Sequence, residues 1–341
     1  MPAFELPSTM RAVVLHAYDA LDKLTVEQFP VPRPQAGQVL VRMHASPINP
    51  SDLAFLRGVY SKTPLPTIPG IEGSGVVVAS GAGLFAKALV GRRVACIASG
   101  DGAGGAWAEY LVVPALTCIP LKASVSLEQG AMHFVNPLTA CLLMAEARRE
   151  HARAVVQTAA AGALGKMLVR LARQCGVTTI NIVRREEQAQ ALHALGAQHV
   201  LNSAAENFTE RLFEICRAED ARLAFDAVGG DMAGVILRAM PNGARLISYG
   251  ALSLQPLTLD PRAFISTGKK IEGFHLGRAI GQQKLFSRLQ VVRQARHMLT
   301  HELQSEIQAC IPMTEIVQGI QRYTQNMSAG KILLMLGQRT T

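Results

Sequence analysis

Short apolar runs interrupted by glycine and proline fill the first third of the chain. Residues 39–46 (VLVRMHAS) alternate apolar and polar positions, a pattern typical of a half-buried strand. Further runs rich in small and β-branched residues stand at 73–80, 92–99 and 108–114. Runs of this length between turn residues predict a compact, mainly antiparallel β-domain.

From about residue 129 strands alternate with helices. RAVVQ at 153–157 and TTINIV at 178–183 predict strands, and the segment between them is periodic like a helix up to Gly176. A second helix is expected over 186–196. QHVL, RLAFD and ARLISY continue the strands, and GDMAGVILRAM supplies a helix. The alternation predicts an α/β fold with a parallel sheet, doubly wound as in Rossmann dinucleotide-binding domains.

The end of the chain returns to the first pattern. Residues 283–302 place apolar side chains at helical spacing, which predicts a packed helix. IQACIP, a helix from about residue 314 and KILLML then resemble the opening third. We therefore expect two domains, one formed by residues 1–128 and 303–341 and the other by residues 129–302.

Composition narrows the class of protein. Hydrophobic residues make up 49% of the chain and charged residues 17%, which is typical of a well-packed globular protein. No run approaches the roughly 18 apolar residues of a membrane helix, and the N-terminus does not resemble a signal peptide, so we expect a cytoplasmic protein with no membrane partner. The net charge of +9 comes from scattered basic pairs, which favours small phosphorylated ligands over nucleic acid.

The six cysteines include no Cys-x-x-Cys pair. A tetrathiolate zinc lobe and a redox dithiol both require such local pairs. The cysteines are therefore interpreted as small buried hydrophobic residues in a reducing compartment.

A loop of small residues, TAAAGALG at 158–165, lies between the first strand and the first helix of the α/β region. Gly162 would let the backbone approach a pyrophosphate, and Gly165 would let the helix pack closely against the sheet. The amides at the start of that helix attract negative charge. The alternative is close packing without a ligand. The candidate cofactor-binding residues here are Ala160, Gly162, Ala163, Leu164 and Gly165.

Arg184 and Arg185 follow the second strand of this region. A site for NAD would be expected to present Asp or Glu there to the ribose diol, whereas guanidinium groups suit a 2′-phosphate. The pair therefore favours NADPH as the cofactor. The alternative is that these are solvated surface arginines.

The order of motifs resembles the medium-chain dehydrogenase/reductase superfamily over essentially the whole chain. The stretches that carry the resemblance are VLVRMHASPINPSD, PGIEGSGVV, VGRRVACIA, GGAWAEYLVVP, NPLTA, AAAGALG, FDAVGG, ISYGAL and GKILL. The resemblance implies a GroES-like catalytic domain built from both ends of the chain, a Rossmann domain in the middle and a cleft between them.

The alcohol dehydrogenases of that superfamily hold a catalytic zinc with cysteine, histidine and a third ligand. The corresponding positions resemble Asn49, Ile71 and Val135 in this sequence. None of the three side chains is a good zinc ligand, so the chain resembles the zinc-independent branch and we expect no metal site. Glu72, in PGIEG, is interpreted as a structural carboxylate near the cleft floor, hydrogen-bonded or paired with a base.

Two subfamilies of that branch compete. The mitochondrial-type 2-enoyl thioester reductases match INPSDLAFLRGVY, NPLTACLLM, TINIVRREE and GFHLG more closely than the quinone oxidoreductases do. One departure is His275, which stands where the enoyl reductases usually carry Trp. It puts the acyl-chain pocket in doubt.

The resemblance assigns further candidate residues. Tyr60 matches the tyrosine that donates a proton or polarises the carbonyl, and Asn49 is the second candidate catalytic residue, with a turn residue before Pro50 as its alternative. Asn136 and Thr139 of NPLTA would line the nicotinamide pocket, although a threonine at a helix start also serves as a cap. The remaining candidates for cofactor binding are Tyr249, Gly250 and Phe274, after strands of the sheet, and Lys331 of GKILL.

These observations leave three hypotheses. The first is an NADPH-dependent reductase of α,β-unsaturated thioesters or enones, and the second is an NADPH:quinone oxidoreductase. The third is a non-catalytic NADPH-binding protein. The superfamily is usually dimeric or tetrameric, so we expect a homodimer or homotetramer, with residues 247–257 as the candidate interface segment.

Overall fold

The computed structural model describes residues 6–59, 63–98, 104–282 and 303–337. Its contacts divide the chain into Met1–Val135 with Gln304–Thr341, called the split unit below, and Asn136–Leu303, called the central unit. The first division falls at residue 135 where the sequence pattern suggested 128, and the second lies one residue from the expected position.

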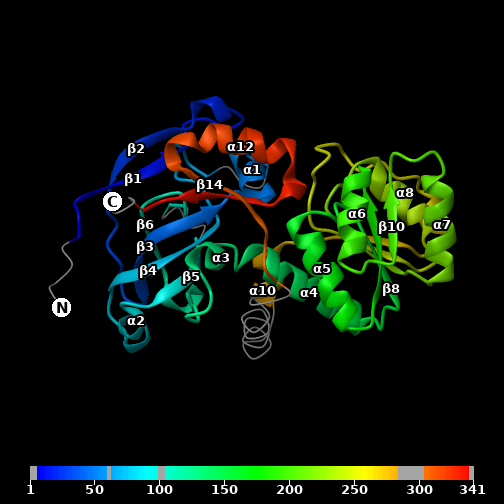
Figure 1. The fold of residues 1–341 in the computed structure, drawn as a ribbon, viewed down its shortest axis with the longest axis horizontal. Helices are drawn as coiled ribbons and strands as arrows, with labels where there is room; N and C mark the ends of the chain where they lie inside the picture. Colours follow the sequence, from blue (N-terminus) through cyan, green and yellow to red (C-terminus); the bar gives the residue numbers. More distant parts are fainter. Residues whose placement is uncertain (1–5, 60–62, 99–103, 283–302, 338–341) are drawn as a thin grey trace. The chain divides into compact units, whose positions relative to one another are not determined.

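The split unit is built on a seven-stranded sheet (Figure 1). Six strands follow the order β14-β15-β3-β4-β5-β7, and β6 also pairs with β3. Every pair is antiparallel except β14 with β15. A separate antiparallel pair is formed by β1 (Thr9–Val14) and β2 (Thr25–Pro30). The strands of the main sheet are β3 (Gln38–Pro47), β4 (Glu72–Ser80), β5 (Arg93–Ile97), β6 (Tyr110–Pro114), β7 (Ile119–Pro120), β14 (Ile307–Pro312) and β15 (Lys331–Met335).

Strand β3 joins the two ends of the chain. It pairs with β4 along most of its length, with β6 at its first residues and with β15 at its last, where Leu334 lies opposite Ser46. Side chains from the first and last segments share one hydrophobic core, which includes Ile48, Leu56, Ile320 and Leu334. The C-terminal segment therefore completes the core begun by the first third, as Figure 1 shows for α12 beside α1.

Short helices connect these strands. Helix α1 (Pro50–Leu56) begins with proline at its first turn and a capping box between Asn49 and Asp52. The other α-helices of the split unit are α2 (Leu84–Leu89), α3 (Leu127–Ala131) and α12 (Ile316–Gln325). Single 3₁₀ turns occur at Leu21–Lys23, Ala115–Thr117, Met313–Glu315 and Met327–Ala329.

The central unit contains a six-stranded sheet in the order β10-β9-β8-β11-β12-β13. All of its pairs are parallel, as a doubly wound fold requires. Its strands are β8 (Ala154–Gln157), β9 (Thr178–Val183), β10 (His199–Asn202), β11 (Leu223–Asp226), β12 (Arg245–Ser248) and β13 (Lys270–Gly273). Its helices are α4 (Val135–Arg149), which starts at the last residue of the split unit, α5 (Ala163–Gln174), α6 (Glu186–Ala194), α7 (Phe208–Ala218), α8 (Asp231–Ala239), α9 (Arg262–Ile265) and α10 (Leu276–Gln282). The helix expected over 283–302 lies outside the described residues.

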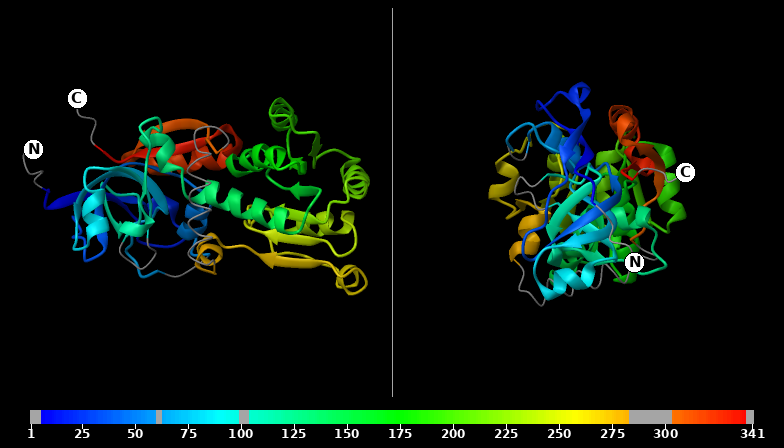
Figure 2. Two further views of the ribbon diagram at one scale, coloured as in Figure 1. Left: turned by 90° about the horizontal axis from the view of Figure 1, so that it is seen from below. Right: turned by 90° about the vertical axis from the view of Figure 1, so that its left-hand side faces the viewer.

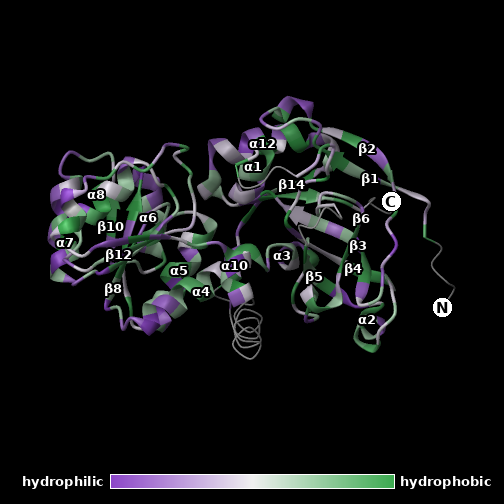
Figure 3. Ribbon diagram, turned by 180° about the vertical axis from the view of Figure 1, so that it is seen from behind, coloured by the Kyte–Doolittle hydropathy of each residue, from purple (hydrophilic) through white to green (hydrophobic). Residues whose placement is uncertain are grey.

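The helices flank this sheet (Figure 2) because its strands are apolar on both faces. Val156 and Ala224 belong to a core shared with Leu212 of α7 and Ile236 of α8. Their neighbours Val155, Leu223 and Phe225 have no exposed surface and point to the opposite face. Figure 3 shows the same contrast, with apolar strands and polar outer surfaces on helices such as α7.

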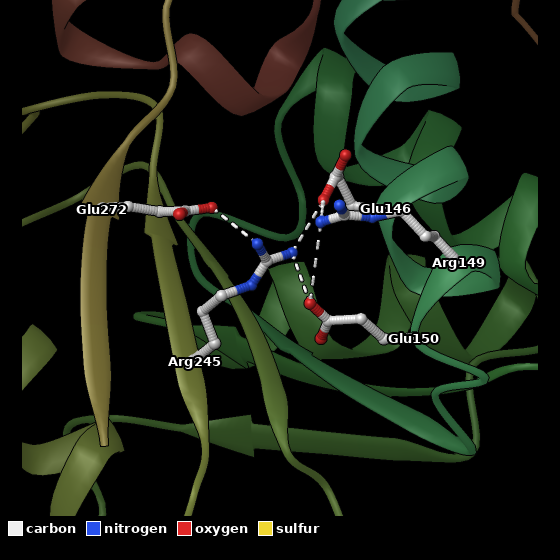
Figure 4. A network of polar contacts seen from close by, with 5 residues as sticks. All are labelled: Glu146, Arg149, Glu150, Arg245 and Glu272. Atoms are coloured by element: carbon white, nitrogen blue, oxygen red, sulfur yellow. Dashed lines mark hydrogen bonds and ion pairs between the residues drawn. The ribbon is translucent and has the colours of Figure 1, made fainter. Parts of the chain in front are cut away.

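An ion network ties α4 to the sheet (Figure 4). The guanidinium of Arg245 contacts Glu146 at 2.8 Å, Glu150 at 2.7 Å and Glu272 at 2.9 Å. Arg149 of α4 also contacts Glu146 and Glu150. Arg245 opens β12, so the network fixes the beginning of that strand, away from the carboxyl edge where ligands bind in such folds.

Two expectations from composition can be checked. The interpretation of all six cysteines as buried is wrong for Cys175 and Cys310, which are exposed. Cys175 follows the last turn of α5 and Cys310 lies on β14, the last strand of its sheet path, so each is placed at a margin of its unit. Among the described residues, no helix is long and apolar enough to cross a membrane.

Candidate active site

The small-residue loop follows β8 and leads into α5. Ala159 has φ +48°, and Gly162 immediately precedes the first turn of α5, in which Ala163 and Leu164 present their backbone amides. Gly165 is required at its position, because a Cβ atom there would lie 2.3 Å from the carbonyl oxygen of Ala160. A close backbone approach at Gly165 is therefore confirmed, with the loop residue Ala160 rather than with a strand, and the loop brings all five candidate residues to the carboxyl end of β8.

Three other candidate groups lie at this same edge of the central sheet. Arg184 and Arg185 follow β9 with exposed side chains, and Arg185 precedes the first turn of α6. Tyr249 and Gly250 follow β12, and Phe274 follows β13. Because all six strands are parallel, their carboxyl ends share one edge, where ligands bind in doubly wound folds.

Tyr249 is the candidate at this edge whose chemistry is altered by its surroundings. Burial, followed by the nearby Asp226 carboxylate, raises the pKa of its phenol above the ordinary value. The phenol is therefore protonated at neutral pH and can donate a hydrogen bond.

Asn136 and Thr139 lie in α4 and are buried. Thr139 is the fifth residue of that helix, so it is not the N-terminal cap that the sequence left open as an alternative. Both residues belong to the central unit, and their proposed contact with nicotinamide stays a prediction.

Asp226, which the sequence analysis did not assign, holds two loops of the central unit together. It ends β11 with no exposed surface. Its Oδ1 accepts from the Thr158 hydroxyl at 2.7 Å and from the Val228 amide at 2.9 Å, and its Oδ2 accepts from the Gly229 amide at 2.9 Å. The signal for it in the sequence was an acid at the end of an apolar strand, three residues before a Gly-Gly pair, in RLAFDAVGG.

The candidates of the split unit meet in a second buried cluster. Asn49 has no exposed surface, and its Nδ2 donates to Glu72 Oε1 at 2.9 Å. Its Oδ1 accepts from the ammonium of Lys331, which also donates to the Tyr323 hydroxyl at 3.4 Å. Lys331 is 1% exposed. The structure therefore brings Asn49 and Lys331 together, although the sequence placed them in different roles.

Glu72, whose place beside β-branched residues is unusual for a carboxylate, is the centre of this cluster. It is 2% exposed, and its Oε2 accepts from the amides of Phe134 at 2.8 Å and Val135 at 3.0 Å. Burial raises its pKa, while the Val135 amide and the charge of Lys331 act in the opposite direction. The expectation that Glu72 is hydrogen-bonded and near a base is confirmed, and its purely structural role near a cleft floor stays a prediction.

Asp52 extends the cluster along α1. Its Oδ2 accepts from the Asn49 amide at 2.8 Å and its Oδ1 from the Ile71 amide at 3.0 Å. Burial, opposed by the Asn49 hydrogen bond, raises the pKa of Asp52 to about 7. Asp52 therefore accepts hydrogen bonds from the backbone amides of residues 49 and 71, and Glu72 accepts from those of residues 134 and 135.

Two candidates do not enter either cluster. Tyr60, the proposed proton donor, lies outside the described residues. His275, the departure from the enoyl reductase pattern, is exposed next to α10, where its Nδ1 accepts from the Arg278 amide at 3.3 Å.

The chain is similar in sequence to known families and proteins, and the matches agree with this two-unit architecture. Residues 35–123 match the alcohol dehydrogenase GroES-like domain family, and residues 163–291 match the zinc-binding dehydrogenase family. The mitochondrial enoyl-[acyl-carrier-protein] reductase of Xenopus tropicalis is 30% identical over 294 residues, covering 82% of this chain and 81% of the relative. Its counterpart in Caenorhabditis elegans is 31% identical over 258 residues, covering 74% and 72%.

A solved structure also matches nearly the whole chain. It is a Mesorhizobium loti protein described as a candidate NADPH:quinone reductase, with 35% identity, a TM-score of 0.91 and coverage of 97% of this chain and 100% of that one. The chain belongs to the medium-chain dehydrogenase/reductase superfamily. It is an oxidoreductase of that superfamily, and its similarity to these relatives indicates a reductase.

The family name raises the question of zinc, and the residues present do not fit that ion. The Asn49 amide is already bonded to Glu72 and Lys331, and Ile71 and Val135 have hydrocarbon side chains. Across residues 6–59, 63–98, 104–282 and 303–337, no group of three or more His, Cys, Asp or Glu side chains could hold a metal ion.

Proposed function

We propose that the chain is an NADPH-dependent, zinc-independent reductase that transfers hydride to the activated C=C bond of an α,β-unsaturated thioester or enone. The observation that carries the proposal is the identity of 30–31% with the enoyl-[acyl-carrier-protein] reductases over about three quarters of the chain or more. Those enzymes are named for an enoyl-[acyl-carrier-protein] substrate, and the motifs INPSDLAFLRGVY, NPLTACLLM, TINIVRREE and GFHLG favour the same subfamily.

The preference for NADPH is supported at the carboxyl edge of the central sheet. The amides that open α5 face the region where a pyrophosphate binds in such folds, and the exposed guanidinium groups of Arg184 and Arg185 follow β9. Guanidinium groups form bidentate hydrogen bonds with phosphate groups such as the 2′-phosphate of NADPH. The Mesorhizobium loti protein is likewise named for NADPH.

NADPH, when bound, supplies the hydride that adds to the β-carbon of the alkene. Charge then moves onto the carbonyl oxygen, so the chain must present hydrogen-bond donors to that oxygen. The Tyr60 phenol is assigned this role, and it also delivers the proton that completes reduction. Asn49, the second candidate catalytic residue, is held by side-chain hydrogen bonds to Glu72 and Lys331.

A quinone is the second candidate substrate. The 35% identity to a protein described as an NADPH:quinone reductase covers 97% of this chain, which is more of the chain than the enoyl reductases match. Hydride transfer to a quinone uses the same cofactor and asks for no acyl pocket, and His275 stands where the enoyl reductases carry Trp.

Parallel assays of NADPH oxidation with crotonyl-CoA and with benzoquinone test the proposal. We expect turnover of crotonyl-CoA at a higher kcat/KM than benzoquinone. Faster turnover of benzoquinone would favour the quinone reductase. Binding of NADPH without turnover of either substrate would favour the non-catalytic hypothesis.

Tyr60→Phe tests the assigned proton donor. We expect crotonyl-CoA turnover to fall by about 10²-fold or more, because general-acid catalysis is lost, while the dissociation constant of NADPH stays unchanged. The matched control is Tyr110→Phe, because Tyr110 is a buried tyrosine of β6 in the same unit. Activity of Tyr60→Phe equal to that of Tyr110→Phe and of the original chain would remove Tyr60 from the mechanism.

The proposed assembly is a homodimer through β13. This strand is the last in the described order of the central sheet, and exposed apolar side chains lie in and beyond the candidate segment 247–257. They are Leu252, Leu254, Leu257 and Ile265. Light scattering should give a mass of twice 36.6 kDa, and a monomeric mass would contradict this assembly.

A further inference from the structure

The hydrogen bonds around Asp226 determine which group donates and which accepts at each contact of the cluster. Val228 and Gly229 approach the carboxylate with backbone N–H groups, which can donate and never accept. The Thr158 hydroxyl donates to the same carboxylate, and its oxygen accepts from the Ala227 amide at 2.8 Å. All three groups that meet the carboxylate are therefore donors, and the hydroxyl proton has one orientation.

This cluster joins two loops that lie at a special point of the central sheet. Strand order runs outward from β8 through β9 in one direction and through β11 and β12 in the other, so the topology reverses between β8 and β11. Thr158 follows β8 and Asp226 ends β11. Dinucleotides bind beside such a reversal in doubly wound folds.

The loop after β11 is fixed on its other side as well. The amides of Leu252 and Ser253 donate to the carbonyls of Ala227 at 3.0 Å and Val228 at 2.9 Å. Gly229 and Gly230 both have positive φ, +70° and +59°, conformations that glycine adopts without strain. The Asp226 carboxylate therefore joins this fixed loop to Thr158 in the loop after β8, beside the Ala227 amide, which donates to the Thr158 hydroxyl.

We propose that Asp226, acting through Thr158 and the amides of Val228 and Gly229, is a positioning residue that sets the loops after β8 and β11 for NADPH binding. The inference rests on the proposed nucleotide site. It assigns to Asp226 no contact with the cofactor.

Asn at position 226 provides the sharpest test. An amide nitrogen placed at either carboxylate oxygen would face a backbone N–H donor, Val228 at Oδ1 or Gly229 at Oδ2. Asp226→Asn should raise the dissociation constant of NADPH by about tenfold or more, since a hydrogen bond to a charged group is removed and two donors oppose each other. The kcat at saturating NADPH should change much less, which gives a rise in KM with a nearly constant kcat.

Variants of Thr158 keep the test valid if Asp226→Asn folds poorly. Thr158→Val removes the hydroxyl link and should weaken NADPH binding, whereas Thr158→Ser preserves it and should restore binding to within about threefold of the original chain. Because the two residues share one hydrogen bond and each makes others, the double variant Thr158→Val with Asp226→Asn should lose less NADPH affinity than the sum of the two single losses. Additive losses would contradict the link.

The matched control is Asp231→Asn, which removes an exposed carboxylate from the first turn of α8. It should leave NADPH binding unchanged. If the original chain binds NADPH and Asp226→Asn binds it equally well despite a lower Tm, Asp226 is merely structural and the inference is overturned. If the original chain binds no NADPH, the proposed function is overturned and the inference with it.

Discussion

Both units bury carboxylates, but they compensate them differently. In the split unit, Glu72 and Asp52 share a cluster with the ammonium of Lys331, which reaches Glu72 through the amide of Asn49. In the central unit, Asp226 is surrounded by a hydroxyl and two backbone amides, all uncharged donors. The first cluster adds a buried ammonium, bonded to Asn49, to the amides that meet its carboxyl groups, whereas every donor to Asp226 is uncharged.

This difference indicates which substitutions each cluster can accommodate. Removing one member of a buried ion pair leaves an uncompensated charge, which costs far more than the pair gains. A carboxylate held by several N–H and O–H donors loses one hydrogen bond at a time. We therefore expect the split unit to be sensitive to charge and pH, and the central unit to be sensitive to donor geometry.

The largest effect is expected from Lys331→Met. The ammonium has 1% exposure, and its loss removes the positive charge that lowers the pKa of the buried Glu72 carboxyl. The free energy of unfolding in urea should fall by about 3–5 kcal/mol. Lys23→Met, at an exposed position, is the control and should change it little.

A second substitution sharpens this result. With Lys331 absent, the Asn49 amide is free to reverse, so its oxygen can accept from a glutamine at position 72. Adding Glu72→Gln to Lys331→Met should therefore recover part of the lost stability. A double variant as unstable as the sum of the two single losses would show that the charges are not coupled.

The pH dependence of stability gives the next effect. Burial raises the pKa of Asp52 from 3.8 to about 7, so the folded chain binds a proton that the unfolded chain has released in this range. The stability that this group contributes is complete below about pH 4 and is lost as the pH rises toward 7, by a change on the order of 4 kcal/mol. Lys331 and Glu72 face the same carboxyl group and shape this window.

Asp52→Asn should flatten that dependence, measured as urea unfolding at pH 4, 5.5 and 7. The control Asp22→Asn alters an exposed carboxylate and should preserve the slope. A slope that is the same in Asp52→Asn and in the original chain would assign the window to another group.

A smaller effect is expected in the central unit. Thr158→Val removes one donor from Asp226 and the acceptor of the Ala227 amide, and it leaves the charge balance intact. The unfolding free energy should fall by about 2 kcal/mol, with no new dependence on pH. A loss as large as that of Lys331→Met would erase the distinction between the two clusters.

The sequence predicted much of the fold because its signals were local. Alternation in VLVRMHAS, the helix closed by Gly176 and the small residue at Gly165 each report on their own segment, and the structure places strands, helices and a close backbone approach there. Glu72 was also interpreted correctly, because an isolated carboxylate among β-branched residues requires a partner.

The clusters themselves could not be read from the chain. Lys331 and Asn49 are 282 positions apart and Thr158 and Asp226 are 68 apart, so no periodicity connects them. Lys331 was assigned to the cofactor by its motif, whereas its buried ammonium bonds to Asn49 and Tyr323. Without the sheet register, neither pairing follows from composition or spacing.

The central claim is that these residues support reduction without a metal ion, and NADPH oxidation by metal-depleted protein tests it most directly. Protein treated with a chelator, with its zinc content measured, should reduce crotonyl-CoA at the rate of untreated protein within about a factor of two, since no Lewis acid contributes. Loss of turnover on depletion, restored by one equivalent of zinc per chain, would contradict the account.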